Sequence, residues 1–378
     1  MRNKVILLSS FVPANNASPV SVNTKMVQLC SETFVHTELV TANFPEEAVK
    51  DIPKDRFTLT NIDVSFPKDS SLGNIFRYAK MQFKMIGVLK KRDKKDLAVL
   101  FWLSGPMILP FIYCKVARFY TVGFLYGNSR KKADRVTLFN CMKAKLMEII
   151  AKRSNLMCME SPSVAAHWGL PYDPQKIQLV HLFVDTEKFS PDRQFDERPL
   201  VIGMCGRLAH SKRIVESIQA FHQLKDKYPN YKMEIAGNGP LMRKCQQLIE
   251  QLGETDRIRL LGWVDNDSLP HYIRRWRLML APTNYEGIPN SLLEAMACGT
   301  PALSSPVGGI PDVIENGVDG WLLPDNKPET IARWLDSLLE DQAKLAEASV
   351  QSRKKVLERY SFMPALHNFR KFAQRIRN

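Results

Sequence analysis

The sequence predicts an α/β protein built from two Rossmann-like, doubly wound domains. Its 378 residues are enough for two domains of ordinary size, and its 45% apolar and 24% charged content is that of a globular protein. Short apolar runs alternate with helical patterns, as in parallel sheets. Candidate binding residues directly follow the apolar runs, and ligands of such sheets bind at the carboxyl ends of the strands.

In the first half, residues 5–10 predict the first strand rather than a short secretory signal, because the apolar run is short and the charged start is weak. Residues 97–114 carry no charge, and the stretch is just long enough for a membrane-spanning helix, which is one interpretation. A strand at 97–103, a turn with glycine and proline, and a helix at 107–118 explain the same residues. A further strand is expected at 121–126.

A helix is predicted at residues 74–95, with an apolar stripe formed by Phe76, Ala79, Phe83, Ile86 and Leu89. Arg77, Lys80 and Lys84 fall off this stripe, and five more basic residues follow between Lys90 and Lys95. Two interpretations stay open. The helix either buries its stripe in the core and solvates its basic face, or lies on an anionic membrane surface.

The second half has a regular pattern of strands and helices. Strands are expected at residues 200–205, 231–236, 258–261, 278–281 and 301–304, and helices at 214–228, 240–252, 268–275 and 289–298. Polar or glycine residues follow four of these strands: Arg207, Gly237 with Gly239, Trp263 and Glu286. This concentration predicts a binding site at the carboxyl edge of the second sheet.

The segment from Glu286 to Pro301 places two carboxylates, Glu286 and Glu294, around the start of a helix. Pro289 suits a first helical turn and Gly299 suits the residue after a helix end, so the helix is expected at 289–298. The backbone N–H groups of residues 288–290 would then attract an anion such as phosphate. The spacing alone also fits an ordinary capped surface helix.

Two cations, Arg207 and Lys212, follow the strand at 200–205, where a guanidinium fork and an ammonium suit a diphosphate. Each alone would be an ordinary surface charge. Asp265 and Asp267 resemble a metal-holding Asp-x-Asp pair, but they directly precede a helix and are expected to cap it. The seven histidines have no paired ligand spacing, so no metal site is expected.

The chain has a net charge of +14, with 53 basic and 39 acidic residues. Most of the surplus lies in residues 1–196, which suits a nucleic acid, an anionic membrane surface or an acidic substrate. The seven cysteines are scattered and odd in number, which argues against a disulfide framework and fits a reducing cytoplasm.

Several segments occur in a specific order along residues 155–358. They are residues 181–191, Gly206-Arg207 with Lys212, Gly262-Trp263-Val264, the stretch from Glu286 to Glu294, and residues 306–314 followed by Gly317 and Gly320. In this order they resemble glycosyltransferase family 4 (glycosyltransferase group 1), which comprises retaining nucleotide-sugar transferases of the GT-B fold. The first half departs from the family pattern. It has Asn15-Asn16 in place of a Gly-Gly loop and no histidine between His36 and His167.

The resemblance implies roles for individual residues. Arg207 and Lys212 would hold the donor diphosphate, Glu286 would contact sugar hydroxyls, and these three form the expected catalytic set. The remaining expected donor contacts are Ile288, Pro289 and Asn290 at the distal phosphate, Gly287 beside them, Glu294 at the ribose, and Trp263 and Val264 near the base. Such enzymes retain anomeric configuration by front-face attack, and we assign no catalytic base.

The resemblance also implies an acceptor-binding domain at 1–185, a donor-binding domain at 186–358 facing it across a cleft, and a final helix in 359–378 that packs back on the first domain. The expected reaction moves a hexose or N-acetylhexosamine from a nucleoside diphosphate, UDP favoured over GDP, to a glycan or lipid-linked acceptor. It would serve cell-surface polysaccharide or glycolipid synthesis at the inner face of the cytoplasmic membrane.

No cofactor, metal or nucleic-acid partner is expected. Two alternatives remain: a catalytically silent sugar-nucleotide-binding subunit, favoured by the missing histidine and glycine pair, and a nucleic-acid-binding protein, suggested by charge alone.

Overall fold

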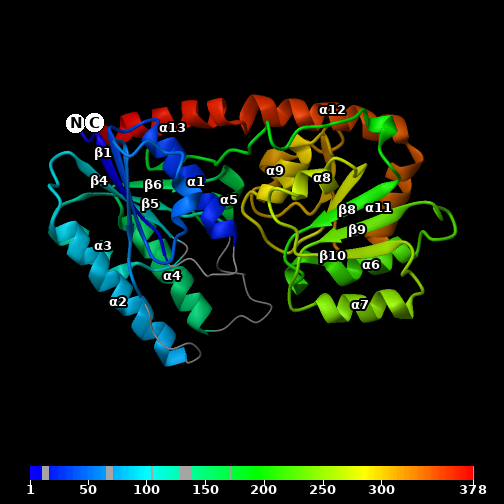
Figure 1. The fold of residues 1–378 in the computed structure, drawn as a ribbon, viewed down its shortest axis with the longest axis horizontal. Coiled ribbons are helices and arrows are strands. Elements are labelled where there is room, and N and C mark those ends of the chain that lie inside the picture. The colour runs from blue at the N-terminus through cyan, green and yellow to red at the C-terminus, as the bar shows by residue number, and fades with distance from the viewer. Residues whose placement is uncertain (11–16, 65–70, 104, 128–137, 171, 378) are drawn as a thin grey trace. The chain divides into compact units, whose positions relative to one another are not determined.

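The computed structural model describes residues 1–10, 17–64, 71–103, 105–127, 138–170 and 172–377. The chain forms two compact units (Figure 1). The first domain comprises Met1–Leu182 together with Ala365–Asn378, and the second comprises Phe183–Pro364. The boundary lies three residues before the expected one at 185. Asn15 and Asn16, the departure noted in the first half, lie outside the described residues.

The first domain is built on a seven-stranded parallel sheet in the order β3-β2-β1-β4-β5-β6-β7. Its strands are β1 (Lys4–Leu8), β2 (His36–Thr41), β3 (Phe57–Asn61), β4 (Leu97–Trp102), β5 (Tyr120–Phe124), β6 (Leu156–Met159) and β7 (Ile177–Leu179). The strand order reverses between β1 and β4, as in doubly wound folds. All six residues of β4 are buried, as expected for a central strand covered on both faces.

The helices of the first domain pack on both faces of this sheet. They are α1 (Ala17–Ser31), the short η1 (Glu46–Val49), α2 (Ser71–Lys90), α3 (Ile108–Val116), α4 (Leu138–Arg153) and α5 (Pro162–His167). The uncharged stretch 97–114 is therefore a buried strand followed by a helix. Among the described residues, no helix is both long and apolar enough to cross a membrane.

Helix α2 buries a different stripe from the one expected. Met81, Met85 and Leu89 are fully buried, whereas Phe76 and Phe83 are each 64% exposed. The expected stripe and the observed one both have helical spacing, and packing against the sheet and α3 selects the methionine face. Of the two interpretations of this helix, burial of the whole stripe in the core is wrong, because α2 presents the Phe76 and Phe83 rings to solvent.

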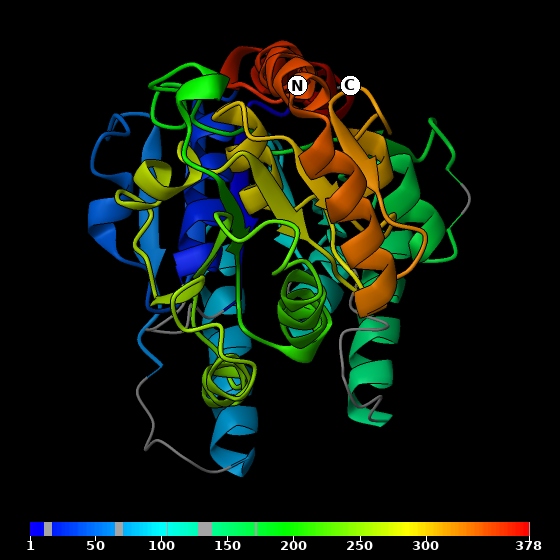
Figure 2. The ribbon, with the colours of Figure 1, turned by 90° about the vertical axis from the view of Figure 1, so that its right-hand side faces the viewer.

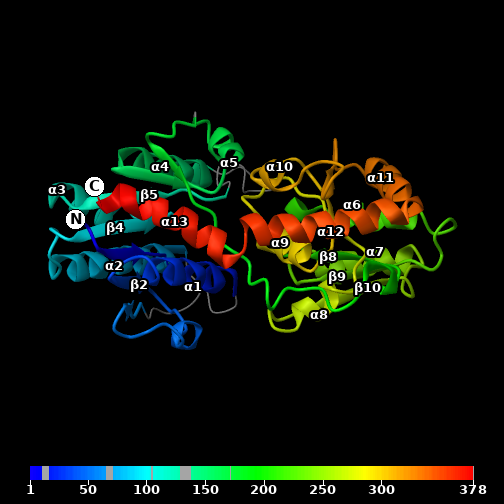
Figure 3. The same ribbon diagram turned by 90° about the horizontal axis from the view of Figure 1, so that it is seen from above.

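The C-terminal helix α13 (Phe362–Arg377) packs its last turns on the first domain. Phe369 meets Phe34 edge to face with ring centroids 6.4 Å apart, and Phe372 meets Phe124 at 5.6 Å. The Arg377 guanidinium donates to the Thr33 carbonyl at 2.6 Å. These contacts place the two chain ends side by side (Figures 1 and 3).

The second domain is built on a six-stranded parallel sheet in the order β10-β9-β8-β11-β12-β13. Its strands are β8 (Val201–Cys205), β9 (Lys232–Ala236), β10 (Ile258–Gly262), β11 (Leu278–Ala281), β12 (Ala302–Ser304) and β13 (Gly320–Leu322). The order reverses between β8 and β11, which makes the carboxyl ends of these two strands the switch point where ligands bind in such sheets.

Helices cover both faces of the second sheet, and Figure 2 shows this domain end-on with α11 in orange. The helical segments are η2 (Phe195–Glu197), η3 (His210–Lys212), α6 (Ile214–His222), α7 (Met242–Gln251), α8 (Leu269–Ile273), α9 (Asn290–Ala297), α10 (Ile310–Val313), α11 (Pro328–Glu340) and α12 (Gln342–Arg359). Helix α6 ends six residues before the expected end at 228, and turns follow it.

Trp276 forms the centre of the core between β8 and α9. It is fully buried, and its indole N–H donates to the Glu234 carboxylate at 3.0 Å. A Cβ on Gly203, in the middle of β8, would lie only 1.7 Å from a ring carbon of Trp276. The ring therefore packs directly against the backbone of β8, which fixes the strand that leads into the candidate site.

Candidate donor site

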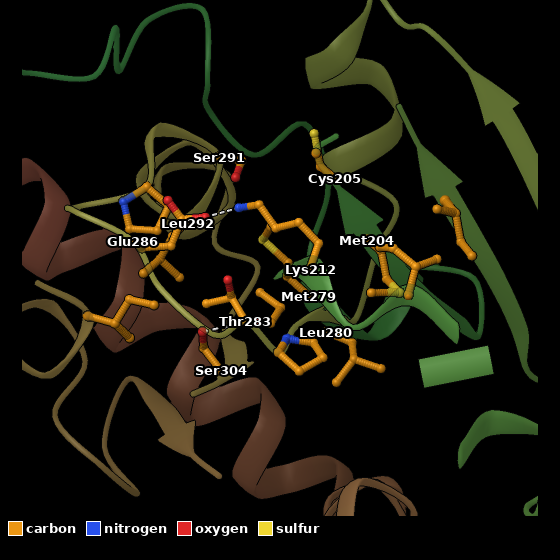
Figure 4. Close-up of a pocket in the computed structure, with 17 residues that line it drawn as sticks. Met204, Cys205, Lys212, Met279, Leu280, Thr283, Glu286, Ser291, Leu292 and Ser304 are labelled. Atoms are coloured by element: carbon orange, nitrogen blue, oxygen red, sulfur yellow. Dashed lines mark hydrogen bonds and ion pairs between the residues drawn. The ribbon is translucent and has the colours of Figure 1, made fainter. Parts of the chain in front are cut away.

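An ion pair joins the loops that follow the two strands at the switch point. Lys212 lies in η3 after β8, and Glu286 lies in the loop after β11. The Lys212 ammonium donates to Glu286 Oε1, with side chains 26% and 20% exposed (Figure 4). These residues are 74 positions apart in the chain, and the neighbouring positions of β8 and β11 bring them together.

Glycines allow the loop after β8 to pack against the loop after β9. A Cβ on Gly237, at φ +143°, would lie 1.9 Å from the Gly206 carbonyl oxygen, and one on Gly239 would lie 2.4 Å from that of Leu208. The backbone N–H of Leu208 donates to the Asn238 carbonyl at 3.0 Å. Gly237 and Gly239 thus allow the two loops to approach closely. The contact holds in place the loop that carries Arg207, whose side chain is exposed.

Hydrogen bonds also fix the loop after β8 to the loop after β11. The Ser211 carbonyl accepts from the Asn284 N–H at 2.8 Å and from the Thr283 hydroxyl at 3.0 Å, and Arg213 donates to the Asn284 side chain. The Thr283 N–H donates in turn to Ser305 after β12. These hydrogen bonds link the segments that carry Lys212 and Glu286 to each other.

Helix α9 starts at Asn290, one residue later than expected. Pro289 has extended backbone at the cap position (φ −69°, ψ 126°), and its carbonyl accepts from the N–H groups of Leu292 and Leu293. Proline lacks an N–H, and Ile288 lies before the helix. The first-turn N–H groups without a protein partner among the described residues are those of Asn290 and Ser291, rather than those of 288–290.

Gly308 holds the Glu286 loop from the other side. At φ +59°, a Cβ on Gly308 would lie 1.8 Å from the Glu286 carbonyl oxygen, and the Gly309 N–H donates to the Gly287 carbonyl at 2.9 Å. Only glycine fits this left-handed position against another backbone. The glycine pair at 308–309 thus positions the segment that carries Glu286.

A small pocket at the ion pair is lined by some of the residues with an expected role and not by others. Its polar lining comes from Cys205, Lys212, Thr283, Glu286, Ser291 and Ser304 (Figure 4), and Pro289 also lines it. Seven residues with an expected role do not line it: Arg207, Trp263, Val264, Gly287, Ile288, Asn290 and Glu294. Sequence reasoning missed Cys205, Thr283, Ser291 and Ser304, although Ser291 directly follows the expected contacts at 287–290, and Cys205 and Ser304 each end a predicted strand.

Glu294 lies in α9 and is 7% exposed, buried near the thiol of Cys205. Burial, followed by the negative charge of Glu294, raises the pKa of Cys205 to about 12, so this thiol stays protonated at neutral pH. Trp263 and Val264 follow the edge strand β10, and Trp263 is 62% exposed. Their loop contacts the rest of the site through the Gly237 N–H, which donates to the Gly262 carbonyl at 2.7 Å.

Asp265 forms a turn before α8 and does not cap it: the cap residue is Ser268, whose side chain makes no cap hydrogen bond, so the capping prediction for Asp265 and Asp267 is wrong. One of the Asp265 carboxylate oxygens accepts from the N–H of Ser268 at 2.8 Å and that of Asp267 at 3.0 Å, and the other accepts from the Ser268 hydroxyl. The bonds from Ser268, its backbone N–H first, hold the pKa of Asp265 below its usual range. The Asp267 carboxylate pairs with Lys188 at 2.6 Å.

Part of the chain matches a known protein family. Residues 185–356 match the family described as glycosyl transferases group 1. An Escherichia coli glycosyltransferase named for colanic acid biosynthesis, WcaL, is 32% identical over 190 residues, 48% of this chain and 47% of its own length. The amylovoran biosynthesis glycosyltransferase AmsK of Erwinia amylovora is 30% identical over 189 residues, 48% of this chain and 46% of its own. The matches thus span about half the length of these curated relatives.

Solved structures resemble the whole chain. HepE of Anabaena, crystallised with UDP and glucose, has a TM-score of 0.76 at 16% identity, and sucrose-phosphate synthase of Thermosynechococcus elongatus has 0.77 at 16%; each match covers 99% of both chains. This likeness confirms the GT-B fold class, with two Rossmann-like domains. The resemblance to the glycosyl transferases group 1 family is thus carried by residues 185–356, in the second domain.

Proposed function

We propose that this protein is a retaining glycosyltransferase that moves a hexose or N-acetylhexosamine from a nucleoside-diphosphate sugar to a glycan or lipid-linked acceptor. One observation carries the proposal. The Lys212–Glu286 pair lies at the β8/β11 switch point, beside the first turn of α9. A cation, a carboxylate and open backbone N–H groups are the groups that a phosphorylated sugar needs.

In this proposal Lys212 and the exposed Arg207 neutralise the donor diphosphate, and the N–H groups of Asn290 and Ser291 donate to its distal phosphate. The diphosphate competes with Glu286 for Lys212, which releases the Glu286 carboxylate to accept from sugar hydroxyls. Gly287, Ile288 and Pro289 hold that carboxylate in place. Glu294 accepts from the ribose, and Trp263 and Val264 lie on the side of the base.

The chemistry is front-face attack, in which the leaving phosphate takes the proton of the acceptor hydroxyl. The dominant contributions are orientation of the sugar and stabilisation of negative charge on the departing diphosphate. Arg207, Lys212 and the α9 N-terminus supply positive charge for this step, so we propose no metal or other cofactor.

UDP is the favoured nucleotide because HepE, which shares the fold, was crystallised with UDP-glucose and with UDP and glucose. The names of WcaL and AmsK support a role in cell-surface polysaccharide synthesis. In this proposal the first domain binds the acceptor and the second binds the donor.

The protein is further proposed to bind the cytoplasmic face of an anionic membrane. The exposed rings of Phe76 and Phe83 share α2 with Lys80 and Lys84, and exposed aromatic and basic side chains together suit a membrane surface. Flotation with phosphatidylglycerol vesicles tests this. Wild-type protein should float at low salt, and Phe76→Ser/Phe83→Ser should not. Wild-type protein left at the bottom would contradict it.

The activity is tested by measuring UDP release from a panel of UDP-sugars with cell-envelope acceptors. Wild-type protein should turn over at least one sugar, and Glu286→Ala should lose about 100-fold or more because it loses the positioning of the sugar. A silent sugar-nucleotide-binding subunit would bind UDP yet release none from UDP-sugars above the Glu286→Ala background.

A further inference from the structure

A second charged pocket lies in the first domain, at the amino edge of its sheet. It has a volume of about 310 Å³ and is lined by Arg2, Lys94, Lys95, Arg118, Phe119, Tyr120 and Asn155. That volume is at the lower end of small-molecule pockets. Four of the seven lining residues are cationic and none is acidic.

The topology brings these residues together from four neighbouring strands. Arg2 precedes β1, Lys94 and Lys95 precede β4, Tyr120 starts β5, and Asn155 precedes β6. All of them therefore lie where the strands begin. Ligands of doubly wound sheets bind where the strands end, so this pocket is separate from any acceptor site at the carboxyl edge.

Two of the four cations keep their donors available. Lys95 and Arg118 are exposed, and their side chains have no hydrogen-bond or ion-pair partner among the described residues. The Lys94 ammonium uses one donor on the Ala117 carbonyl at 3.2 Å. Asn155 accepts from the Thr121 backbone and hydroxyl through its side-chain oxygen, which leaves its NH₂ group as a donor.

Arg2 is held in place at one side of the pocket. Its guanidinium carbon lies 4.2 Å from the centroid of the Tyr120 ring, and one of its nitrogens donates to the Ile376 carbonyl at 2.9 Å. The stacking fixes the plane of the guanidinium and leaves further N–H groups for a ligand. Arg2 is thus oriented before any ligand arrives.

The nearby carboxylates are occupied by backbone and lysine partners. Asp96 accepts from the Asn3 N–H at 2.7 Å and lies 3.9 Å from the Lys4 ammonium. Asp93 accepts from the backbone N–H of Lys95 at 3.0 Å. Neither carboxylate lines the pocket, so neither neutralises the cationic side chains in its lining.

Arg118 also has an unusual backbone. It occupies the residue after the end of α3 with φ +62°, and the Phe119 N–H donates back to the Cys114 carbonyl at 2.9 Å. Glycine is the favoured residue at this left-handed position, and a side chain is disfavoured there. The chain nevertheless carries an arginine at this position, and the arginine lines the charged pocket.

We propose that this pocket binds a compact, multiply charged phosphate group. Guanidinium and ammonium donors from the starts of three strands, with the Asn155 amide from a fourth, match two or more phosphate charges, and no carboxylate lines the pocket to oppose them. The group can belong to a soluble phosphorylated metabolite or to a lipid headgroup with a terminal phosphate, and the chemistry of recognition is the same.

The test measures the affinity for inorganic pyrophosphate by titration calorimetry at low salt. All proteins carry Arg207→Gln/Lys212→Gln, which removes the cations of the proposed donor site and separates the two hypotheses. Adding Lys95→Gln/Arg118→Gln should weaken binding about tenfold or more. The matched control, Lys90→Gln/Lys91→Gln, removes two exposed charges outside the pocket and should leave the affinity within about twofold.

A second variant, Arg118→Gly, guards against misfolding, because it should weaken binding while leaving the melting temperature unchanged or raised. Vesicles with phosphatidic acid then identify the source: pocket-dependent binding indicates a lipid headgroup, and pyrophosphate binding alone indicates a soluble ligand. Equal affinity in the pocket variant and the control, or no binding in either arm, would overturn the proposal.

Discussion

The Gly308→Ala substitution tests how the candidate donor site is held in shape. The new Cβ would lie 1.8 Å from the Glu286 carbonyl oxygen, so the two must separate by at least 1.2 Å to reach 3.0 Å. The atoms nearest to this Cβ, the Glu286 carbonyl oxygen and carbon, belong to the backbone, so the Glu286 segment has to move. A misplacement of about 1 Å in an active site can reduce turnover by about 100-fold.

Gly317→Ala is the matched control. Gly317 also has left-handed backbone, at φ +86°, but nothing lies within 4 Å of its ideal Cβ. Both variants should lose roughly 1 kcal/mol of stability from backbone strain. Only Gly308→Ala should lose kcat/KM for UDP release from a UDP-sugar, by about 100-fold. Equal kcat/KM in the two variants would refute the reasoning that Gly308 positions Glu286.

Three further results are expected. Arg198→Met should lower the free energy of unfolding by roughly 3 kcal/mol or more in urea titrations, because the buried guanidinium donates to the carbonyls of Trp276, Cys298 and Gly299; a loss under 1 kcal/mol would contradict this. Lys355→Met should lower the melting temperature, because Lys355 pairs with the buried Asp319. The matched control Lys354→Met, at the adjacent position, should leave the melting temperature nearly unchanged. Burial lowers the pKa of His181 below 6.5, so as the pH falls the unfolded chain binds the proton before the folded chain does, and the free energy of unfolding decreases below pH 6.5. His181→Gln should flatten the pH dependence of the free energy of unfolding in this range. An unchanged pH dependence would contradict this.

Much of the second domain follows from local pattern. The strand at 278–281 and its neighbours have the expected positions because short apolar runs between turn residues have few alternatives. The meeting of Lys212 and Glu286 does not follow from local pattern, since they are 74 residues apart. It depends on the strand order, and the family resemblance supplied that expectation.

Where the sequence pattern predicted a buried face or a helix end wrongly, tertiary packing determined the observed one. Two stripes of α2 have helical spacing, and only the packing of Met81 and Met85 against the sheet tells them apart. Helix α6 ends at His222, although Leu224 and Tyr228 continue an apolar pattern and pack against the core from the turns beyond it. The cationic pocket around Arg2 and Arg118 has no motif in the sequence, because its residues come from four separate segments.

The most direct test of the central claim is the affinity of UDP for Lys212→Gln, measured by titration calorimetry against Lys225→Gln. Lys212 pairs with Glu286 at the switch point, while Lys225 is an exposed lysine of the same domain. The wild-type protein and Lys225→Gln should bind UDP equally, and Lys212→Gln should bind it about tenfold or more weakly. Equal affinity in all three proteins would contradict a donor site between β8 and β11.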